Sequence, residues 1–192
     1  MFWESAEPLE VRCGAACDPE RARQWHSTVV REWGECGRVA MENDEVLGFI
    51  KYAPPAYLPQ AMNFPGHVPA GRSVLIACLH IRDDARRHGL GTLLLRAALR
   101  DLAMRGERTV FAYAGETTAD MTDTPVIGVE FLIRNGFRVA SPHPAYPLLR
   151  LDLKSLAMWT ENLEAVLDSL RIPLRRPARV PSPTVESRGA KE

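Results

Sequence analysis

Lysine is nearly absent from this 192-residue sequence, and the sequence contains no long apolar run. Lysine stands only at positions 51, 154 and 191, so arginine carries nearly all of the positive charge. We take this bias as a sign of a GC-rich bacterial genome rather than of a function. No apolar stretch approaches the roughly 20 residues of a membrane-spanning helix, and the first residues do not resemble a signal peptide. We therefore expect a cytoplasmic protein with no membrane partner.

The sequence also lacks a net charge, because 24 basic residues balance 24 acidic ones. A balanced composition gives no indication of a surface that binds polyanions. Arginines do gather at positions 82, 86 and 87, but Asp83 and Asp84 interrupt them. No aromatic residues alternate with these arginines to offer stacking platforms for bases. We expect no nucleic-acid partner.

Only four cysteines are present, and their spacing bears on metal binding. Cys78 lies inside an apolar run and is expected in the core. Cys13 and Cys17, together with Cys36 and His26, form the combination that most suggests zinc. The first two are not spaced as C-x-x-C, however, and no second pair follows. We expect free thiols and no metal.

The most informative segment is a basic, glycine-containing stretch at positions 86–92, which reads Arg-Arg-His-Gly-Leu-Gly-Thr. An apolar run at 74–81 precedes it, and a leucine-rich amphipathic segment at 93–104 follows, whose expected buried stripe is Leu94, Leu95, Ala98, Leu99 and Leu102. Strand, loop and helix in this order build an anion-binding site, because the first N–H groups of a helix have no intrahelical partner and carry partial positive charge. The glycines remove Cβ atoms that would hold a phosphate away from these amides. The natural occupant is a pyrophosphate.

The glycine spacing distinguishes between families of phosphate-binding loops. The dinucleotide fingerprint needs a third glycine at the position where Leu94 stands. The P-loop needs a lysine directly after a glycine, and no lysine follows Gly89 or Gly91. What remains is [R/Q]-x-x-G-x-[G/A] after a strand, which resembles the acetyl-CoA loop of the GNAT superfamily of N-acetyltransferases. The downstream segment 131–137 also resembles the helix of that family that ends in Gly-Phe. The resemblance extends to about Lys154.

The resemblance implies an α/β (α+β) chain with the GNAT fold, whose central mixed, mostly antiparallel sheet is flanked by helices. We expect this domain at 1–154, with a poorly defined N-terminal segment at 1–17. Apolar periodicity predicts an added C-terminal amphipathic helix at 155–172. That helix caps its own domain or pairs with a second subunit, so a homodimer is a candidate assembly. The proline-containing tail at 173–192 is expected to be disordered.

Helical and strand periodicities give the order of elements within the domain. A helix should begin after Asp18 and end by Gly37, and a second-half helix should span 125–135. The expected strands are 38–41, 46–52, 74–81, 109–114, 138–140 and 148–153. Between the second and third of these, the proline-rich segment 53–69 is too apolar for an ordinary loop. It forms either a wall of the acceptor pocket or a loop packed over the sheet edge.

The resemblance also implies the residues that bind acetyl-CoA. In the family, the main chain of a splayed strand binds pantetheine and polarises the thioester, and the glycine loop binds the pyrophosphate. The cofactor-binding positions implied here are Leu79, His80, Ile81, Arg86, Arg87, His88, Gly89, Leu90, Gly91 and Thr92.

The acid–base residues of the family transfer poorly. Many members carry Glu or His at positions matching Leu75 or Ala77, and a general-acid tyrosine at the position of Leu132; all three are apolar here. Substitutes must come from elsewhere, and the catalytic candidates are His80, Tyr113, Glu116 and Tyr146. The alternative interpretation is that the histidine is satisfied on the sheet face and that Tyr146 is a packing residue.

Two functions follow. The first is an acetyl-CoA-dependent N-acetyltransferase that acts on a primary amine of a small molecule or a protein, by direct attack of the amine on the thioester. The alternative is a catalytically weak GNAT-fold module that binds acyl-CoA or regulates a partner, which the missing base and acid favour.

Overall fold

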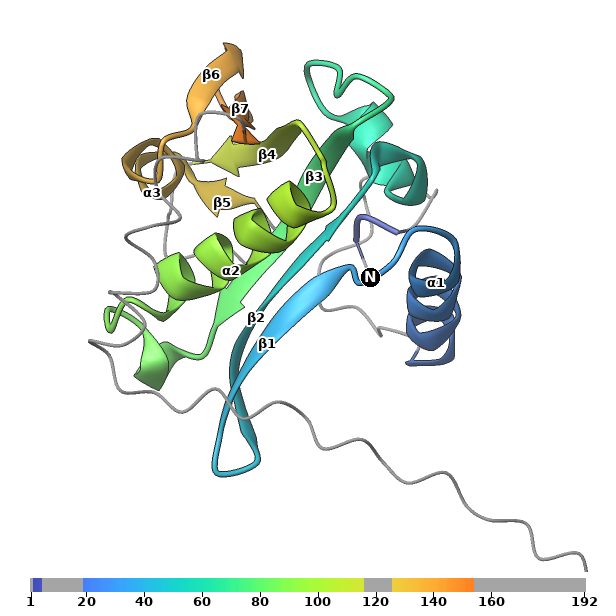
Figure 1. Ribbon diagram of the computed structural model, residues 1–192. Coiled ribbons are helices and arrows are strands. Elements are labelled where there is room, and N and C mark those ends of the chain that lie inside the picture. Colours follow the sequence, from blue (N-terminus) through green and yellow to red (C-terminus); the bar gives the residue numbers. More distant parts are fainter. Residues whose placement is uncertain (1, 5–18, 116–125, 154–192) are drawn as a thin grey trace, which may run out of the picture. The chain divides into compact units, whose positions relative to one another are not determined.

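The computed structural model describes residues 2–4, 19–115 and 126–153 (Figure 1). The expected C-terminal helix and tail, the N-terminal segment from residue 5 to 18 and the candidate Glu116 lie outside these residues. Within the described ranges, no helix is both long enough and apolar enough to cross a bilayer.

A seven-stranded sheet organises the described residues, in the order β1-β2-β3-β4-β7-β6, with β5 paired to the end of β4. Four of the strand pairs are antiparallel, and only β3–β4 and β4–β5 are parallel. The expected mixed, mostly antiparallel sheet with flanking helices is therefore confirmed. The strands are β1 Gly37–Glu42, β2 Glu45–Ala53, β3 Ser73–Ile81, β4 Thr109–Gly115, β5 Ile127–Gly128, β6 Arg138–Ser141 and β7 Leu148–Asp152.

Alternation along the central strands divides the core between the two faces of the sheet. On β3, Val74 and Ile76 join a cluster with the buried leucines of α2 (Leu90–Met104), whereas Leu75 and Ala77 join a second cluster on the opposite face. Val29 of α1 (Pro19–Glu32) belongs to that second cluster. We call the two sides the α2 face and the α1 face. Figure 1 shows α2 running along its face of the sheet.

The helices differ from the expected ones mainly at their ends. The buried stripe of α2 is confirmed as Leu94, Leu95, Ala98, Leu99 and Leu102. Helix α1 ends at Glu32 rather than near Gly37, because Gly34 adopts a φ of 116° and its N–H donates to the Val29 carbonyl at 3.0 Å. Helix α3 (Val129–Arg134) begins later than position 125, because β5 precedes it and pairs with β4. Short-range periodicity could not indicate that pairing, which depends on a distant strand.

The proline-rich segment packs over a face of the sheet rather than over its edge. It forms two short 3₁₀ turns, Pro55–Tyr57 and Pro59–Asn63, and buries Leu58 and Phe64 on the α1 face. The Phe64 ring lies 4.8 Å from that of Tyr113 on the central strand β4. The Tyr113 hydroxyl donates to the carbonyl oxygens of Ala61 at 3.1 Å and Gly66 at 3.2 Å. The segment therefore forms part of the core of the α1 face.

Candidate functional site

Strands β3 and β4 separate halfway along β3. Their parallel pairing runs from Ser73 opposite Thr109 to Ile76 opposite Ala112. Beyond that point β3 continues to Ile81, while β4 pairs with β7 and β5. In the part of the chain that the structure describes, no strand pairs with the β4-facing edge of β3 after Ile76. Alternate main-chain groups along that edge are consequently available to a ligand.

A β-bulge lies at the point of separation. Lys51 of β2 faces Cys78 and Tyr52 faces Ile76, so Ala77 is an extra residue on β3. A bulge bends its strand and increases the local twist. The bulge therefore supplies a local reason why β3 leaves β4 at this level. It also sets the register beyond it, where Leu79 packs on the α2 face and His80 lies on the α1 face opposite Phe49.

The turn from β3 into α2 uses two left-handed residues. Arg87 has a φ of 65° and Gly89, which precedes the first helical residue, has a φ of 81°. Arginine rarely adopts this conformation, which costs on the order of 1–2 kcal/mol for a residue with a side chain. Such a cost is typical of a segment whose backbone is shaped for a ligand.

The N-terminus of α2 leaves amides without partners. The first hydrogen bond that enters the helix runs from the Leu93 N–H to the Gly89 carbonyl at 3.0 Å, and Gly89 offers no side-chain cap. Among the described residues, no acceptor meets the N–H groups of Leu90, Gly91 and Thr92. A Cβ built on Gly89 would meet nothing within 4 Å, so the space beside these amides is open. The helix begins at Leu90, three residues before the amphipathic segment 93–104 that the sequence indicates.

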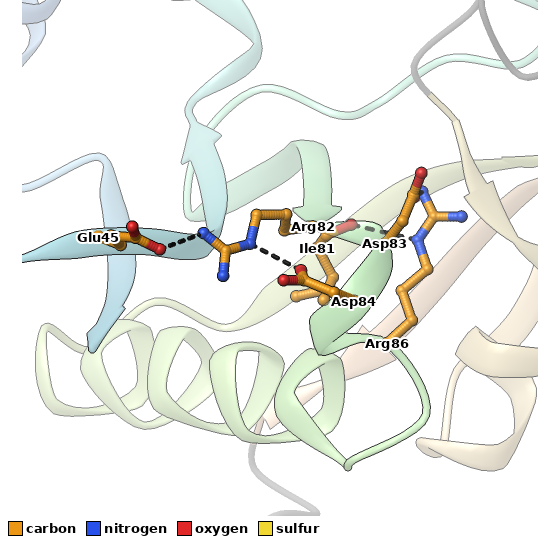
Figure 2. A network of polar contacts seen from close by, with 6 residues as sticks. All are labelled: Glu45, Ile81, Arg82, Asp83, Asp84 and Arg86. Carbon is orange, nitrogen blue, oxygen red and sulfur yellow. Dashed lines mark hydrogen bonds and ion pairs between the residues drawn. The ribbon is translucent and has the colours of Figure 1, made fainter. Parts of the chain in front are cut away.

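Two of the four basic residues near this turn are engaged within the protein (Figure 2). Arg82 donates to Asp84 at 2.6 Å and to Glu45 of β2 at 2.8 Å. These hydrogen bonds raise the pKa of Arg82, and the guanidinium in turn lowers the pKa of Asp84. The pairs are exposed, so solvent screens them and their contribution to stability is small. Their effect is to hold the turn against the β1–β2 hairpin.

Arg86 connects the turn to the end of β3. Its Nε donates to the Ile81 carbonyl at 3.1 Å, and its guanidinium pairs with Asp83 at 3.0 Å (Figure 2). Arg87 and His88 are exposed and form no ion pair with the described residues. The positive charge available to an anion at the helix N-terminus therefore comes from Arg87, His88 adds a hydrogen-bonding ring, and Arg86 stabilises the turn.

The structure distributes the catalytic candidates over two places. His80 is exposed, and its ring lies 5.7 Å from that of Phe49. The rings of Tyr113 and Tyr146 both contact that of Phe64, with centroid distances of 4.8 and 5.3 Å. This group lies on the β4–β7 side of the sheet, whereas the His80–Phe49 pair lies on β3 and β2. Burial raises the pKa of Tyr113 to about 12. With its hydroxyl donated to two carbonyls, Tyr113 anchors the proline-rich segment. The catalytic roles of all these residues stay predictions.

The positions where a base and an acid were sought are closed to solvent. Leu75, Ala77 and Leu132 are each no more than 1% exposed. Sequence reasoning missed a different group, Glu4, whose carboxylate is buried and pairs with Lys51 of β2. A single glutamate near the start of a chain carries no spacing or motif that predicts burial, so the sequence offered no signal for it.

Comparison with known proteins places this geometry in a family context. Residues 2–124 match the model of the acetyltransferase (GNAT) family. An N-acetyltransferase from Staphylococcus aureus Mu50 is similar at a TM-score of 0.50 and 18% identity, over 72% of this chain and 78% of that one. A ribosomal-protein-alanine N-acetyltransferase from Brucella melitensis is similar at a TM-score of 0.49 and 19% identity, over 71% and 78% of the two chains.

A third solved structure, of the PaiA N-acetyltransferase from Thermoplasma acidophilum in complex with coenzyme A, has a TM-score of 0.47 and 12% identity, over 72% of this chain and 81% of that one. No curated protein sequence matches the chain significantly. At these identities the structural likeness concerns the fold.

Proposed function

Because the chain belongs to the acetyltransferase (GNAT) family, we propose that it transfers an acetyl group from acetyl-CoA to a primary amine of a small molecule or a protein. The amine attacks the thioester directly. The observation that carries this proposal is a juxtaposition at one end of β3. There the strand edge without a partner leads straight into a helix N-terminus whose first amides have no acceptor among the described residues.

The helix N-terminus fits the diphosphate of CoA. Its amides at Leu90, Gly91 and Thr92 can donate to phosphate oxygens, and the open space beside Gly89 admits them. Arg87 adds a positive charge that no described acid neutralises, and the exposed His88 adds a hydrogen-bonding ring. Arg86 contributes by holding the turn to Ile81. These contacts would position acetyl-CoA, which supplies an activated acyl group as its thioester.

The free edge of β3 is suited to the acyl end of the same molecule. Main-chain groups of Leu79, His80 and Ile81 lie along it, and the Ile81 carbonyl already accepts from Arg86. An N–H fixed in a strand is a preorganised donor for a developing oxyanion. One such donor is commonly worth about 10²–10³ in rate. The protein would thus orient and polarise the acyl group with its backbone, and side chains would be left with the proton transfers.

A second function, an acyl-CoA-binding or regulatory module with weak catalysis, is favoured by one observation. Leu75 and Ala77 of β3 and Leu132 of α3 stand at the positions where a base and an acid were expected from the family. None of the three has a titratable side chain, and all are buried. The backbone features that bind CoA do not require those positions, so binding without turnover is physically coherent.

Two measurements on the purified full chain distinguish the functions. Calorimetry measures the affinity for CoA, and release of free thiol from acetyl-CoA is followed with a panel of amines. The panel includes phenethylamine, hexylamine and a peptide with an N-terminal alanine. Thiol release that depends on an amine supports the enzyme. Tight CoA binding without such release supports the module, and the absence of CoA binding would contradict both functions.

A further inference from the structure

The carboxylate of Glu4 is buried beside Lys51 of β2, the strand next to β3. Its side chain is only 1% exposed, and one oxygen, Oε1, accepts a hydrogen bond from the Lys51 ammonium. The other oxygen, Oε2, is buried and has no hydrogen-bond partner among the described residues. A buried carboxylate oxygen that accepts nothing is costly, because the lost hydration is not replaced. Such a group calls for an explanation by a ligand or by chemistry.

Contacts on two strands place Glu4 along the sheet. Its neighbour Trp3 stacks on Tyr113 of β4, with ring centroids 5.7 Å apart and ring planes within 10° of parallel. Tyr113 is the first residue of β4 beyond its last pair with β3. Glu4 itself contacts Lys51 of β2, which lies opposite Cys78. Since β3 runs between β2 and β4, residues 3 and 4 cross β3 at the level of Ala77 and Cys78, where its unpaired edge begins.

The face of the sheet is also determined. Lys51 alternates with Ile50 and Tyr52, which belong to the core of the α2 face, and its ammonium lies 5.4 Å from the ring centroid of Trp25 on α1. The Tyr113 ring lies on the α1 face as well. Glu4 is therefore on the α1 face, the side of β3 opposite the helix that would hold the diphosphate.

This placement matches a requirement of the proposed reaction, on which the inference rests. An amine arrives mainly as an ammonium ion at neutral pH and must lose a proton before its nitrogen can attack. On the α1 face of β3 at this level, Leu75 and Ala77 provide no proton acceptor. His80 lies two residues beyond Cys78, about 7 Å along the strand, and is exposed. The buried oxygen of Glu4 belongs to a carboxylate that contacts Lys51, which lies opposite Cys78, the second residue of β3 after its last pair with β4.

We propose that Glu4 is the general base of this protein, and that its Oε2 takes the proton of the acceptor amine while Lys51 holds Oε1. The ammonium gives one proton to the Glu4 carboxylate and becomes a neutral amine. The amine nitrogen forms a bond to the thioester carbonyl carbon, the carbon–sulfur bond breaks, and the second proton passes from nitrogen to the departing sulfur. Amide and CoA thiol leave, and Glu4 releases its proton to water.

The test compares wild type with Glu4→Gln, which keeps the shape of the side chain and removes the base. The acceptor is the amine of the panel above that supports the fastest thiol release. We expect kcat to fall roughly 10²- to 10⁴-fold, while the calorimetric affinity for CoA and the melting temperature change little. Glu130→Gln, an exposed glutamate in the first turn of α3, is the matched control and should retain wild-type kcat.

A pH profile separates the base from a structural role. Among the described titratable groups, Lys51 contacts Glu4, Cys78 lies opposite Lys51 on β3, and His80 lies two residues further along that strand. If Glu4 is the base, the ratio of wild-type to Glu4→Gln rate shrinks as the pH approaches the pKa of the amine in water, because solvent then supplies neutral amine. A ratio that is constant with pH would indicate a structural effect and overturn the proposal. So would an acidic limb that His80→Gln removes and Glu4→Gln retains.

Each of the remaining outcomes supports or contradicts the role of Glu4. A Glu4→Gln variant with wild-type kcat, or one that loses CoA affinity in proportion to rate, contradicts the role of Glu4 and leaves the acetyltransferase proposal intact. A wild-type protein that releases no thiol with any amine overturns the acetyltransferase proposal and the base together. If Glu4→Gln does not fold, Glu4→Asp shortens the reach by one methylene and keeps the ion pair. A lower kcat at unchanged CoA affinity then supports the base, and an unchanged kcat refutes it.

Discussion

Replacing Gly89 with alanine should weaken CoA binding while leaving the fold nearly intact. Gly89 has a φ of 81° and an added Cβ meets no protein atom within 4 Å. The cost to folding is therefore limited to the left-handed backbone, which is about 1–2 kcal/mol for an alanine. A ligand, in contrast, meets a methyl group in the open space from which its phosphate would reach the amides of α2.

The effect on binding follows from the contacts at risk. A hydrogen bond between an amide and a charged phosphate contributes about 1.5–3 kcal/mol. Loss of one such bond lowers the affinity for CoA roughly 10- to 150-fold, at 1.4 kcal/mol for each factor of ten. The expected ratio of the two effects, a small loss of stability and a large loss of affinity, distinguishes a binding glycine from a structural one.

Gly71 offers a matched control. It also has a positive φ, 101°, and an added Cβ there likewise meets nothing within 4 Å. It precedes β3, at the opposite end of that strand from the glycine loop. We expect Gly71→Ala to lose similar stability by urea unfolding and no CoA affinity by calorimetry. Equal dissociation constants for Gly89→Ala and wild type, or equal losses of affinity in both variants, would refute the assignment of the loop.

Three further predictions concern charge, a buried hydroxyl and the core. Arg87→Ala should weaken CoA binding roughly tenfold and reduce its dependence on salt, measured by calorimetry at two ionic strengths; a salt dependence equal to that of wild type would contradict this. Tyr113→Phe should lower the free energy of unfolding by about 1–3 kcal/mol, because two carbonyls lose their donor. Since burial raises the pKa of Tyr113 from 10.0 to about 12, the stabilisation by its neutral form is complete below pH 10.0 and is lost as the pH rises towards about 12. Urea unfolding between these pH values should therefore show a shallower decline in the variant, and an equal decline would exclude Tyr113 as its source. Leu95→Ala should cost about 2–5 kcal/mol in urea unfolding, and a cost below 1 kcal/mol would mean that α2 does not pack as described.

Much of the fold could be predicted because its signals are local. The stripe of α2 repeats at helical spacing, and each of its five expected members is buried. Strand β3 was bounded within one residue, because an apolar run buried on both faces is distinctive. The errors fall where a partner far along the chain decides. Ile127 and Gly128 are a strand only because the end of β4 is beside them.

The candidate site was likewise predictable only in those parts that depend on local sequence. The glycine spacing predicted a loop at the start of a helix, and Gly89 is the residue that precedes α2. The roles of the arginines could not be predicted, because Arg82 and Arg86 differ from Arg87 in what surrounds them rather than in sequence. Glu45 approaches Arg82 only through the pairing of β2 with β3.

The sequence by itself determined the strand–loop–helix unit and the family, because both depend on residue types at fixed short spacings. Only the tertiary structure decided where β3 leaves β4, since that depends on the bulge at Ala77 and on pairings with three other strands. It also decided the position of Glu4, which meets Lys51 across 47 residues of sequence. The burial that makes this carboxylate noteworthy is a property of what packs around it, and no short spacing encodes that.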